Sequence, residues 1–341
     1  MKIKKVNIIV LFVIIVGIAG IIRLSQKKPQ PEEFKGPRET VRIAIPRQPM
    51  NSLLIIAAEL GLFSQEGLDV IAKDEYATGT GKRALEGLLA KDVDVATVST
   101  MPIVFKSFER KDFSIIASHN SSGNDSRIVG RRDRGIKQPK DLKGKRIGAP
   151  KGTSMHFFLH MFLLKNGLSE KDVELSFKKI EEIPPALAGG EIDALSIREP
   201  YVQQSMRLLE DNAVVFAEPG MSLKTSNLVV LNKFIKDKPG AIERILRALI
   251  KAERFVKNQP AEAIKIVSRK LGISESELAA IWPEFNLRVS LEQSLLVTME
   301  DQARWAIKNK LTDKTEVPNY LNFIYQDGLK AVKPEAVTII R

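Results

Sequence analysis

Short apolar segments recur along this chain, and each is followed by a polar loop and then by a segment with helical spacing. The first covers residues 41–45, where apolar side chains alternate with others up to Pro46. The further strands expected are residues 67–71, 93–98 and 114–117, and the helices between them are residues 51–60 and 81–89. Strands that alternate with helices through short loops form parallel sheets covered by helices on both faces. The sequence therefore predicts an α/β fold.

A second unit of the same kind begins near Arg127. Its clearest part is residues 141–167, where a strand at 146–149 leads through a short loop into a helix that stops at Gly167. Either Thr153 or Ser154 is placed to cap this helix. The helix start leaves backbone N–H groups unpaired beside the positive end of the helix dipole, which favours an anion. Further strands are expected at residues 173–175, 192–197 and 227–231, and the chain after them is helical.

Polar residues follow the expected strands, at the edge of an α/β sheet where ligands usually bind. They are Gln48, Thr78, Gly79, Thr80, Ser99, Thr100, Asn120, Ser121, Gly152, Thr153 and Ser154. Asn120 and Ser121 belong to a loop expected at residues 118–122. Any one of these residues is more often structural than ligating, so the prediction of a binding site depends on their common placement.

Arg198 lies at the carboxyl end of the strand expected at residues 192–197. An arginine in such a loop is usually solvated. If its side chain points into the cleft, the planar guanidinium suits a sulfonate, a carboxylate or a phosphate.

The N-terminus has the pattern of an export signal. Three lysines within residues 1–5 precede an apolar run from Ile8 to Ile22. Its length lies between that of a signal-peptide core and that of a spanning helix, so cleavage and anchoring both stay open. A weak cleavage site favours an uncleaved anchor over residues 6–23, with Ile21 where a lipoprotein needs cysteine. The body is expected to be periplasmic or otherwise extracytoplasmic, held at the inner membrane by this helix.

Composition excludes several classes of function. Half of the net charge of +12 lies in residues 1–30, which contain six basic residues and no acidic ones. The remaining basic residues are scattered and follow no nucleic-acid-binding motif, so no nucleic-acid partner is expected. The chain has no cysteine, which excludes disulfides, thiolate metal sites and thiol catalysis.

Two apparent motifs do not hold. The run Gly79-Thr80-Gly81-Lys82 lacks the first glycine and the final Ser or Thr of a phosphate-binding loop. His156 and His160 are one helical turn apart, but the glutamate and the third ligand of a zinc site are missing. We therefore expect no metal site.

Four blocks of sequence, within residues 41–310, carry a resemblance to a known family. The blocks are residues 57–70, 84–96, 141–153 and 186–201, the last ending in Glu199-Pro200-Tyr201. In order and spacing they resemble the periplasmic substrate-binding proteins of ABC importers for nitrate, sulfonates, taurine and thiamine precursors. The resemblance implies a two-lobed periplasmic binding protein (type II) fold, with parallel-rich sheets flanked by helices and a ligand cleft between the lobes. It places lobe I at residues 36–127 and 225–341 and lobe II at 128–224, after a signal or anchor and linker at 1–35.

The resemblance also implies a function. It indicates a monomeric binding protein, not an enzyme, that needs no cofactor and closes on a small, anionic ligand of the sulfonate, taurine or nitrate kind. The ligand then passes to permease and ATPase subunits. The family's ligand loops map onto the polar residues named above and onto Arg198, Glu199 and Tyr201. Many members have tryptophan where this chain has Arg198, which puts the familiar ligands in doubt.

Three alternatives stay open at this stage. A membrane-tethered sensory module could use the same cleft without transport, and a binding protein for a thiamine-pyrimidine precursor would take a neutral aromatic ligand. An enzyme that makes the thiamine pyrimidine is disfavoured, because the resemblance to that class requires a cysteine-rich motif.

Overall fold

The computed structural model describes residues 34–77 and 81–340. Contacts divide the chain into Met1–Gly36 and a body of Pro37–Arg341, and the body is described here. The expected signal or anchor at residues 6–23 lies outside the described residues, as do Thr78, Gly79 and Thr80. No helix within the described part of the chain is long and apolar enough to cross a bilayer.

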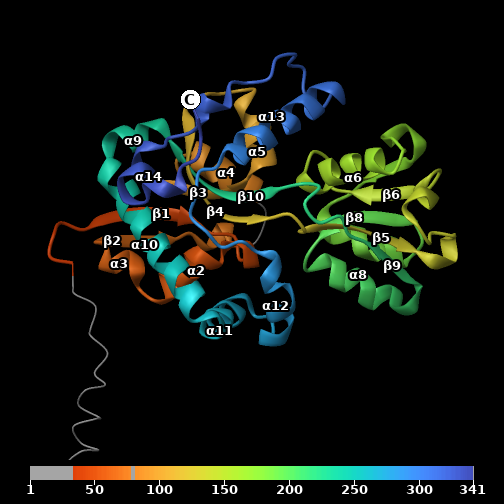
Figure 1. Ribbon diagram of the computed structural model, residues 1–341, viewed down its shortest axis with the longest axis horizontal. Coiled ribbons are helices and arrows are strands. Elements are labelled where there is room, and N and C mark those ends of the chain that lie inside the picture. Colours follow the sequence, from red (N-terminus) through yellow and green to blue (C-terminus); the bar gives the residue numbers. More distant parts are fainter. Residues whose placement is uncertain (1–33, 78–80, 341) are drawn as a thin grey trace, which may run out of the picture. The chain divides into compact units, whose positions relative to one another are not determined.

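Two five-stranded sheets form the body (Figure 1). In spatial order, the first sheet consists of β2 (Leu68–Ala72), β1 (Glu39–Ala44), β3 (Val95–Ser99), β10 (Lys224–Leu231) and β4 (Phe113–Ser122). The second consists of β7 (Glu174–Phe177), β6 (Arg146–Ala149), β8 (Ala194–Arg198), β5 (Ser126–Arg131) and β9 (Ala213–Phe216). We call each sheet with its helices a lobe.

Each sheet is parallel except for one strand. β10 is antiparallel to β3 and β4, and β5 is antiparallel to β8 and β9. Both exceptions follow a crossing between the sheets. Ser126, the first residue of β5, pairs with Arg198, the last residue of β8, so the crossing chain enters where its neighbours end. The crossing strand must therefore run antiparallel to its neighbours. Each of the predicted parallel-rich sheets thus contains one antiparallel strand and is mixed.

Helices cover both sheets. Those of the first lobe are α2 (Ser52–Glu59), α3 (Leu62–Gln65), α4 (Gly81–Leu89), α5 (Thr100–Ser107), α9 (Asn232–Asp237), α10 (Pro239–Asn258), α11 (Pro260–Leu271), α12 (Glu275–Ile281), α13 (Gln293–Lys308) and α14 (Asp327–Val332). Those of the second lobe are α6 (Ser154–Lys165), α7 (Ile183–Ala188) and α8 (Tyr201–Leu209). Short 3₁₀ segments are η1 (Pro49–Asn51), η2 (Asp74–Tyr76), η3 (Arg132–Arg134), η4 (Pro139–Leu142), η5 (Glu170–Asp172), η6 (Ile180–Glu182), η7 (Glu210–Asn212), η8 (Trp282–Glu284), η9 (Tyr320–Phe323) and η10 (Pro334–Ala336).

Successive side chains along a strand pack into cores on opposite faces of the sheet. In β5, Ile128 packs with Phe158 and Phe162 of α6 in one cluster, whereas its neighbour Val129 packs with Leu187 of α7 in another. Successive strand residues point to opposite faces, so the second sheet is buried on both sides. A single larger cluster surrounds the first sheet and includes an apolar stripe of α10: Ile242, Ile245, Leu246, Leu249 and Ile250. Each large side chain buried in this way contributes roughly 1.5–3 kcal/mol.

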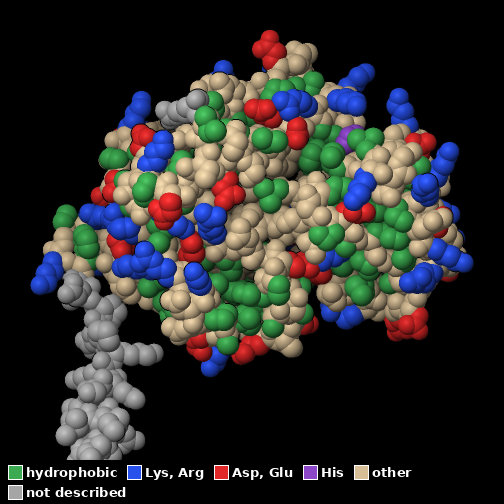
Figure 2. All heavy atoms as spheres, viewed as in Figure 1, with side chains coloured by type: hydrophobic (Ala, Val, Ile, Leu, Met, Phe, Trp, Pro, Cys, Tyr) green, Lys and Arg blue, Asp and Glu red, His purple; other side chains and the backbone are tan. Residues whose placement is uncertain are grey.

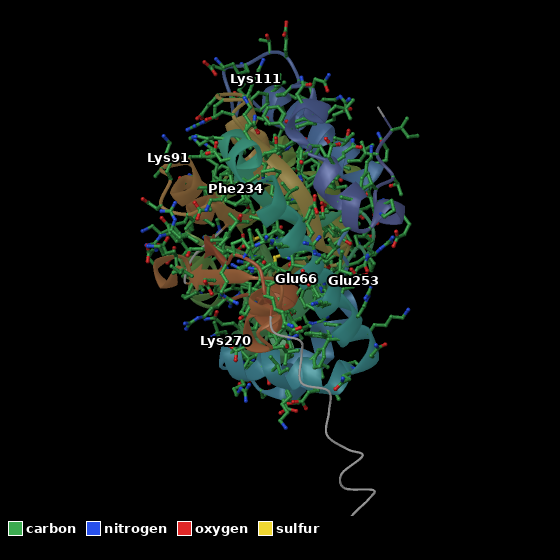
Figure 3. All side chains as sticks on the ribbon, turned by 90° about the vertical axis from the view of Figure 1, so that its left-hand side faces the viewer. Glu66, Lys91, Lys111, Phe234, Glu253 and Lys270 are labelled. Carbon is green, nitrogen blue, oxygen red and sulfur yellow. The ribbon has the colours of Figure 1, made fainter. Side chains whose placement is uncertain are left out.

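Ion pairs attach the long helix α10 to the first lobe. Glu66, between α3 and β2, accepts hydrogen bonds from Arg247 at 2.8 Å and from Lys251 at 2.7 Å. Glu253 of the same helix accepts two from Lys333, at 2.7 and 2.8 Å (Figure 3). Both glutamates are partly buried, which strengthens these contacts relative to pairs in open solvent. They attach α10 to the turn between α3 and β2 and to the segment after α14.

The expected loop at residues 118–122 is wrong, because these residues form the second half of β4. Ser118 pairs with Asn227 and Ser121 pairs with Thr225, both on β10. On the other edge Ser118 exchanges two backbone hydrogen bonds with Ser290, at 2.8 and 2.9 Å. The polar composition indicated a loop, but a backbone paired on both sides can be buried whatever its side chains. The short strand β9 was not predicted.

His119 is buried in the middle of β4, where the register with β10 skips a residue. Neither ring nitrogen has a hydrogen-bond partner within the described residues. Burial lowers the pKa of His119 from 6.5 to about 3, so the folded protein holds this ring neutral. In the unfolded chain the ring takes up a proton as the pH falls below about 6.5. The unfolded state therefore gains stability over the folded state from that pH downwards.

We predict that His119→Leu, which keeps an apolar body and removes the titration, reduces the acid sensitivity of the protein. Between pH 7 and pH 5 the free energy of unfolding should fall by about 2 kcal/mol more in the wild type than in the variant, at about 1.4 kcal/mol per pH unit below 6.5. Urea unfolding at the two pH values measures this. An equal fall in both proteins would show that the ring is not held neutral.

Candidate functional site

A cavity of about 1030 Å³ lies between the two lobes. The first lobe contributes Gln48 after β1, Ser99 at the end of β3 and Lys82 at the start of α4. The second lobe contributes Arg198 at the end of β8 and the loop between β6 and α6. The carboxyl ends of parallel strands thus face each other across the cavity, as expected for ligand sites in open α/β sheets. The volume is at the upper end of the range for small-molecule pockets, roughly 300–1000 Å³.

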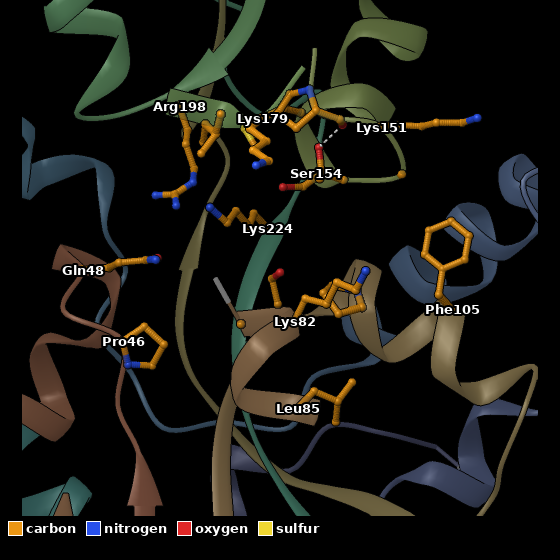
Figure 4. A pocket seen from close by; sticks show the side chains of 18 of the residues that line it. Pro46, Gln48, Lys82, Leu85, Phe105, Lys151, Ser154, Lys179, Arg198 and Lys224 are labelled. Atoms are coloured by element: carbon orange, nitrogen blue, oxygen red, sulfur yellow. Dashed lines mark hydrogen bonds between the residues drawn. The ribbon is translucent and has the colours of Figure 1, made fainter. Parts of the chain in front are cut away.

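One wall of the cavity is cationic. Arg198 and Lys224 extend into it side by side, and Gln48 approaches from the first lobe (Figure 4). The Arg198 guanidinium donates one hydrogen bond, to the carbonyl of Glu199 at 3.2 Å. No carboxylate of the described residues lies within 4.0 Å of it. Within the part of the chain that the structure describes, Arg198 is therefore a cation that faces the cavity without an anionic partner.

Lys224, the first residue of β10, is paired behind this wall. Its Nζ donates to Oδ2 of Asp125 at 2.6 Å, and each side chain is only 8% exposed. Burial lowers the pKa of Lys224, the charge of Asp125 opposes that shift, and the charge of Arg198 reinforces it. An anion bound beside both cations would relieve the repulsion between them.

The loop between β6 and α6 is held by hydrogen bonds among its own residues and the first turn of α6. Thr153 caps α6, as one of the two predicted alternatives: its hydroxyl accepts from the N–H of His156 and donates to the carbonyl of Pro150 at 2.7 Å. Gly152 has φ of +67°, a conformation that favours glycine, and its N–H donates to Nδ1 of His156 at 3.3 Å. Ser154 at the helix start lines the cavity. An anion here would meet the positive end of the α6 dipole.

An apolar cluster joins the lobes beside the cavity. It contains Trp305 of α13 and Phe157 of α6, whose ring centres are 5.4 Å apart, edge to face. The His156 ring lies 5.0 Å from the same indole. Phe105 of α5 packs on this cluster and also lines the cavity. Aromatic contacts of this kind add roughly 0.5–1.5 kcal/mol to the burial of the rings.

The two histidines of α6 have a structural role. Because Nδ1 of His156 accepts from Gly152, its Nε2 carries the proton, and that atom lies 3.6 Å from Glu170. His160 contacts the same carboxylate at 3.1 Å. Burial alone would raise the pKa of Glu170, but the two histidines lower it to about 2. Within the described residues no group of three His, Cys, Asp or Glu could hold a metal ion.

The predicted site residues fall into three groups. Those that line the cavity are Gln48, Ser99, Gly152, Thr153, Ser154 and Arg198. Thr78, Gly79 and Thr80 lie outside the described residues. Those that do not line it are Thr100, Asn120, Ser121, Glu199 and Tyr201.

Residues of the last group face elsewhere for identifiable reasons. Thr100 is fully buried at the start of α5, and Glu199 turns toward α8, where it accepts from the N–H of Gln203 at 3.3 Å. Asn120 and Ser121 line a separate cavity of about 10 Å³. This is room for one water molecule, and neither amide atom of Asn120 has a partner within the described residues.

Many lining residues were missed by the sequence analysis, among them Lys224, Phe105 and Leu311. The position of Lys224, just before the strand expected at 227–231, could have suggested it, because that strand returns from the second lobe. Phe105 lies one turn into the helix after Thr100 and looked like an ordinary core residue. No local signal connects Leu311, far along the chain, to this cavity.

Figure 2 shows the distribution of charged side chains on one face of the body. On the face shown in Figure 2, Lys and Arg are interspersed with Asp and Glu rather than arranged in one continuous stripe. This distribution gives no support for a nucleic-acid-binding surface.

Comparison with known proteins decides the family. A family model described as NMT1/THI5 like matches residues 48–263, more than half of the chain. The chain belongs to the NMT1/THI5-like family.

Relatives of this NMT1/THI5-like protein carry the names of binding proteins. One, from Bacillus subtilis, is named as an aliphatic sulfonates-binding protein and is 27% identical over 285 residues, which cover 80% of this chain and 82% of the relative. Another is the taurine-binding periplasmic protein of Escherichia coli, 23% identical over 229 residues, which cover 62% and 70%. The family resemblance predicted from the four sequence blocks is confirmed.

Solved structures confirm the predicted two-lobed fold. The periplasmic aliphatic sulphonate binding protein of Escherichia coli superposes with a TM-score of 0.72 at 18% identity, covering 85% of this chain and 98% of that one. A desulfurization enzyme also shares the fold, with a TM-score of 0.58 at 16% identity, covering 87% and 99%. The fold alone therefore does not distinguish binding from catalysis.

We predict that Lys224→Met lowers the free energy of unfolding by about 3 kcal/mol, because it leaves the buried carboxylate of Asp125 without its partner. The double variant Lys224→Met with Asp125→Asn should recover most of that loss. The matched control is Lys233→Met, which breaks an exposed pair with Asp237 and should cost less than about 1 kcal/mol. Urea unfolding of the four proteins measures these differences. A double variant no more stable than Lys224→Met would contradict the assignment.

Proposed function

We propose that this protein is the extracytoplasmic solute receptor of an ABC importer, and that it captures a small organic anion of the sulfonate type between its lobes. The observation that carries the proposal is the guanidinium of Arg198, which faces the cavity beside Lys224 and has no carboxylate partner among the described residues. The names of the relatives support sulfonates among the possible anions.

The cavity suits an oxyanion for electrostatic reasons. A guanidinium offers parallel N–H donors to two oxygens of one sulfonate or carboxylate, and such charged hydrogen bonds are roughly twice as strong as neutral ones. The partly buried wall removes competing water, which strengthens the attraction further. Ser99 and Ser154 can add hydroxyl donors from the two lobes.

Binding is coupled to closure of the lobes in this proposal. The chain crosses between the sheets before β5 and before β10, and we assign lobe I to residues 36–127 and 225–341 and lobe II to 128–224. A ligand that contacts Arg198 in one lobe and Gln48 in the other interacts better with the closed form than with the open form. That difference in contacts shifts the population toward closure.

Binding rather than catalysis fits the chemistry of the site. The described lining residues include no histidine or aspartate, and the whole chain contains no cysteine nucleophile. The acidic lining residues are Glu86, Glu109, Glu181 and Glu182. None of these comes with a hydroxyl nucleophile hydrogen-bonded to it, the pairing that nucleophilic catalysis requires.

The proposal includes a location and partners. The body would function outside the cytoplasmic membrane, anchored by residues 6–23, as a monomer. It would deliver its ligand to a permease driven by an ATPase subunit.

We predict that an alkanesulfonate at a hundredfold excess over its Kd stabilises the purified protein by about 2.7 kcal/mol. Arg198→Ala should weaken binding by about ten- to a hundredfold, which corresponds to the loss of a charged hydrogen bond worth about 1.5–3 kcal/mol. Arg207→Ala, an exposed arginine of α8 outside the cavity, is the matched control and should bind as the wild type does.

Thermal unfolding and calorimetric titration with sulfonates, carboxylates and nitrate measure both effects. If none of these anions binds, or if Arg198→Ala binds them normally, the proposed function is wrong.

A further inference from the structure

A buried ring connects a loop that lines the cavity with the opposite lobe. The ring belongs to His156 of α6, which is 1% exposed. We propose that His156 is a positioning residue for the loop of residues 150–154, and that Trp305 of the first lobe holds the ring in the orientation this requires. The loop then takes its ligand-binding conformation when the lobes are in contact. This inference rests on the proposed function and concerns how its site is formed, not which anion it takes.

On the side of the loop, His156 accepts a hydrogen bond from the backbone. The N–H of Gly152 donates to Nδ1 at 3.3 Å, and φ of Gly152 is +67°. A glycine can leave this conformation for others at little cost, so the acceptor selects one of several loop conformations. All five residues from Pro150 to Ser154 line the cavity. The groups that they present to a ligand therefore depend on that selection.

The carboxylate of Glu170 keeps Nδ1 available as an acceptor. It lies 3.6 Å from Nε2 of His156 and 3.1 Å from Nδ1 of His160. Burial would raise the pKa of Glu170, but the two histidines lower it to about 2, so the carboxylate is ionised at neutral pH. A negative charge beside Nε2 favours the proton on that nitrogen, which leaves the lone pair of Nδ1 for the N–H of Gly152.

On the other side, aromatic packing holds the ring between the lobes. Trp305 of α13 meets it edge to face, with ring centres 5.0 Å apart, and Phe177 of β7 meets it at 4.8 Å. Within the described residues Nε2 makes no direct hydrogen bond, so packing largely decides how the ring is turned. Trp305 belongs to the first lobe, whereas His156 and Phe177 belong to the second. Separation of the lobes removes the indole and leaves the ring free to turn.

The loop itself also touches the first lobe. A Cβ at Gly152 would lie 3.4 Å from the ring of Phe105, which packs on the same apolar cluster as Trp305. Contact between the lobes thus acts on the loop directly at Gly152 and through the ring of His156. Because coupling between two equilibria is reciprocal, a ligand that binds the loop favours contact between the lobes to the same extent.

The first test observes the amide proton of Gly152 by NMR in the full chain and needs no ligand. Isotope labels on the glycine nitrogen and the lysine carbonyl carbon select three Lys–Gly pairs, at Gly36, Gly144 and Gly152. His156→Leu keeps an apolar body and removes the acceptor, so the Gly152 signal should move to higher field. His156→Asn places an oxygen at the position of Nδ1 and should keep the signal near its wild-type position. Trp305→Ala should move the signal in the same direction as His156→Leu.

Two control variants separate this role from general packing. His160→Leu removes the other histidine that contacts Glu170 but leaves the hydrogen bonds of the loop in place. Phe108→Ala removes a ring from the cluster of Trp305, and the ring contacts of His156 within the described residues do not include Phe108. Both variants should leave the Gly152 signal at its wild-type position.

The second test is calorimetric titration of the same proteins with ethanesulfonate. His156→Leu should weaken binding about five- to tenfold, the effect of one lost hydrogen bond at a buried donor, and His156→Asn should bind within about twofold of the wild type. Trp305→Ala should weaken binding as well. The double variant of His156→Leu and Trp305→Ala should lose less than the product of the two single effects, because both changes act on the same hydrogen bond.

The outcomes distinguish this inference from the proposed function. An unmoved Gly152 signal in His156→Leu or in Trp305→Ala would overturn the positioning role, as would a His156→Asn variant that behaves like His156→Leu in both tests. Single effects that multiply in the double variant would overturn the coupling to Trp305. If the Gly152 signal moves as expected but ethanesulfonate does not bind the wild type, the proposed function fails and the positioning of the loop is supported.

Discussion

Strand β10 is the constraint on which the rest of the cavity depends. It enters the first sheet between β3 and β4 and is hydrogen-bonded to both. Its first residues therefore lie in a fixed position at the junction of the lobes, where the neighbouring strands end. A lysine in that position is buried, and burial requires a counter-charge. Asp125, in the other crossing between the sheets, supplies it. The hydrogen bonds of β10 to β3 and β4 thus fix the position of the cationic wall and of the chain crossings beside it.

The lobes are connected on two sides of the cavity, by a different kind of interaction on each side. At the crossings the connection is covalent and electrostatic, with Arg127 of β5 paired to Glu284 of η8 in the first lobe. Burial raises the pKa of Glu284 and the charge of Arg127 opposes that shift, so the pair is partly shielded from water. At the far end the connection is apolar, through Trp305 and its neighbours. A ligand in between would touch surfaces held from both sides.

Local patterns predicted much of this structure. Apolar periodicity found most strands and the helices that follow them, and polar residues at strand ends found Arg198 and the loop that begins α6. The resemblance of the four blocks predicted the fold and the family. What failed locally was the polar run that includes Asn120, because its backbone is paired within a sheet and its composition does not reveal this.

Tertiary contacts were beyond the reach of such patterns. Phe105, Trp305 and Leu311 are far apart in sequence and meet through the packing of α5 and α13 against α6. No spacing rule connects them. Asn120 and Ser121 do not line the cavity, again because of a contact distant in sequence: the edge of β4 is covered by a segment near residue 290. The rule that ligands bind at the carboxyl ends of parallel strands predicted the position of the cavity correctly. It overestimated how many strand ends line the cavity.

The position of Trp305 gives this protein an optical property of its own. The chain has two tryptophans, and Trp305 is 4% exposed at the contact between the lobes. Trp282 lies in η8, where it packs on the core of the first lobe and is not part of the apolar cluster that contains Trp305. Separation of the lobes would transfer the Trp305 indole from an apolar contact into water, and its fluorescence emission would move to longer wavelength. Opening and closing could therefore be followed in the unlabelled protein by light, without knowing the ligand.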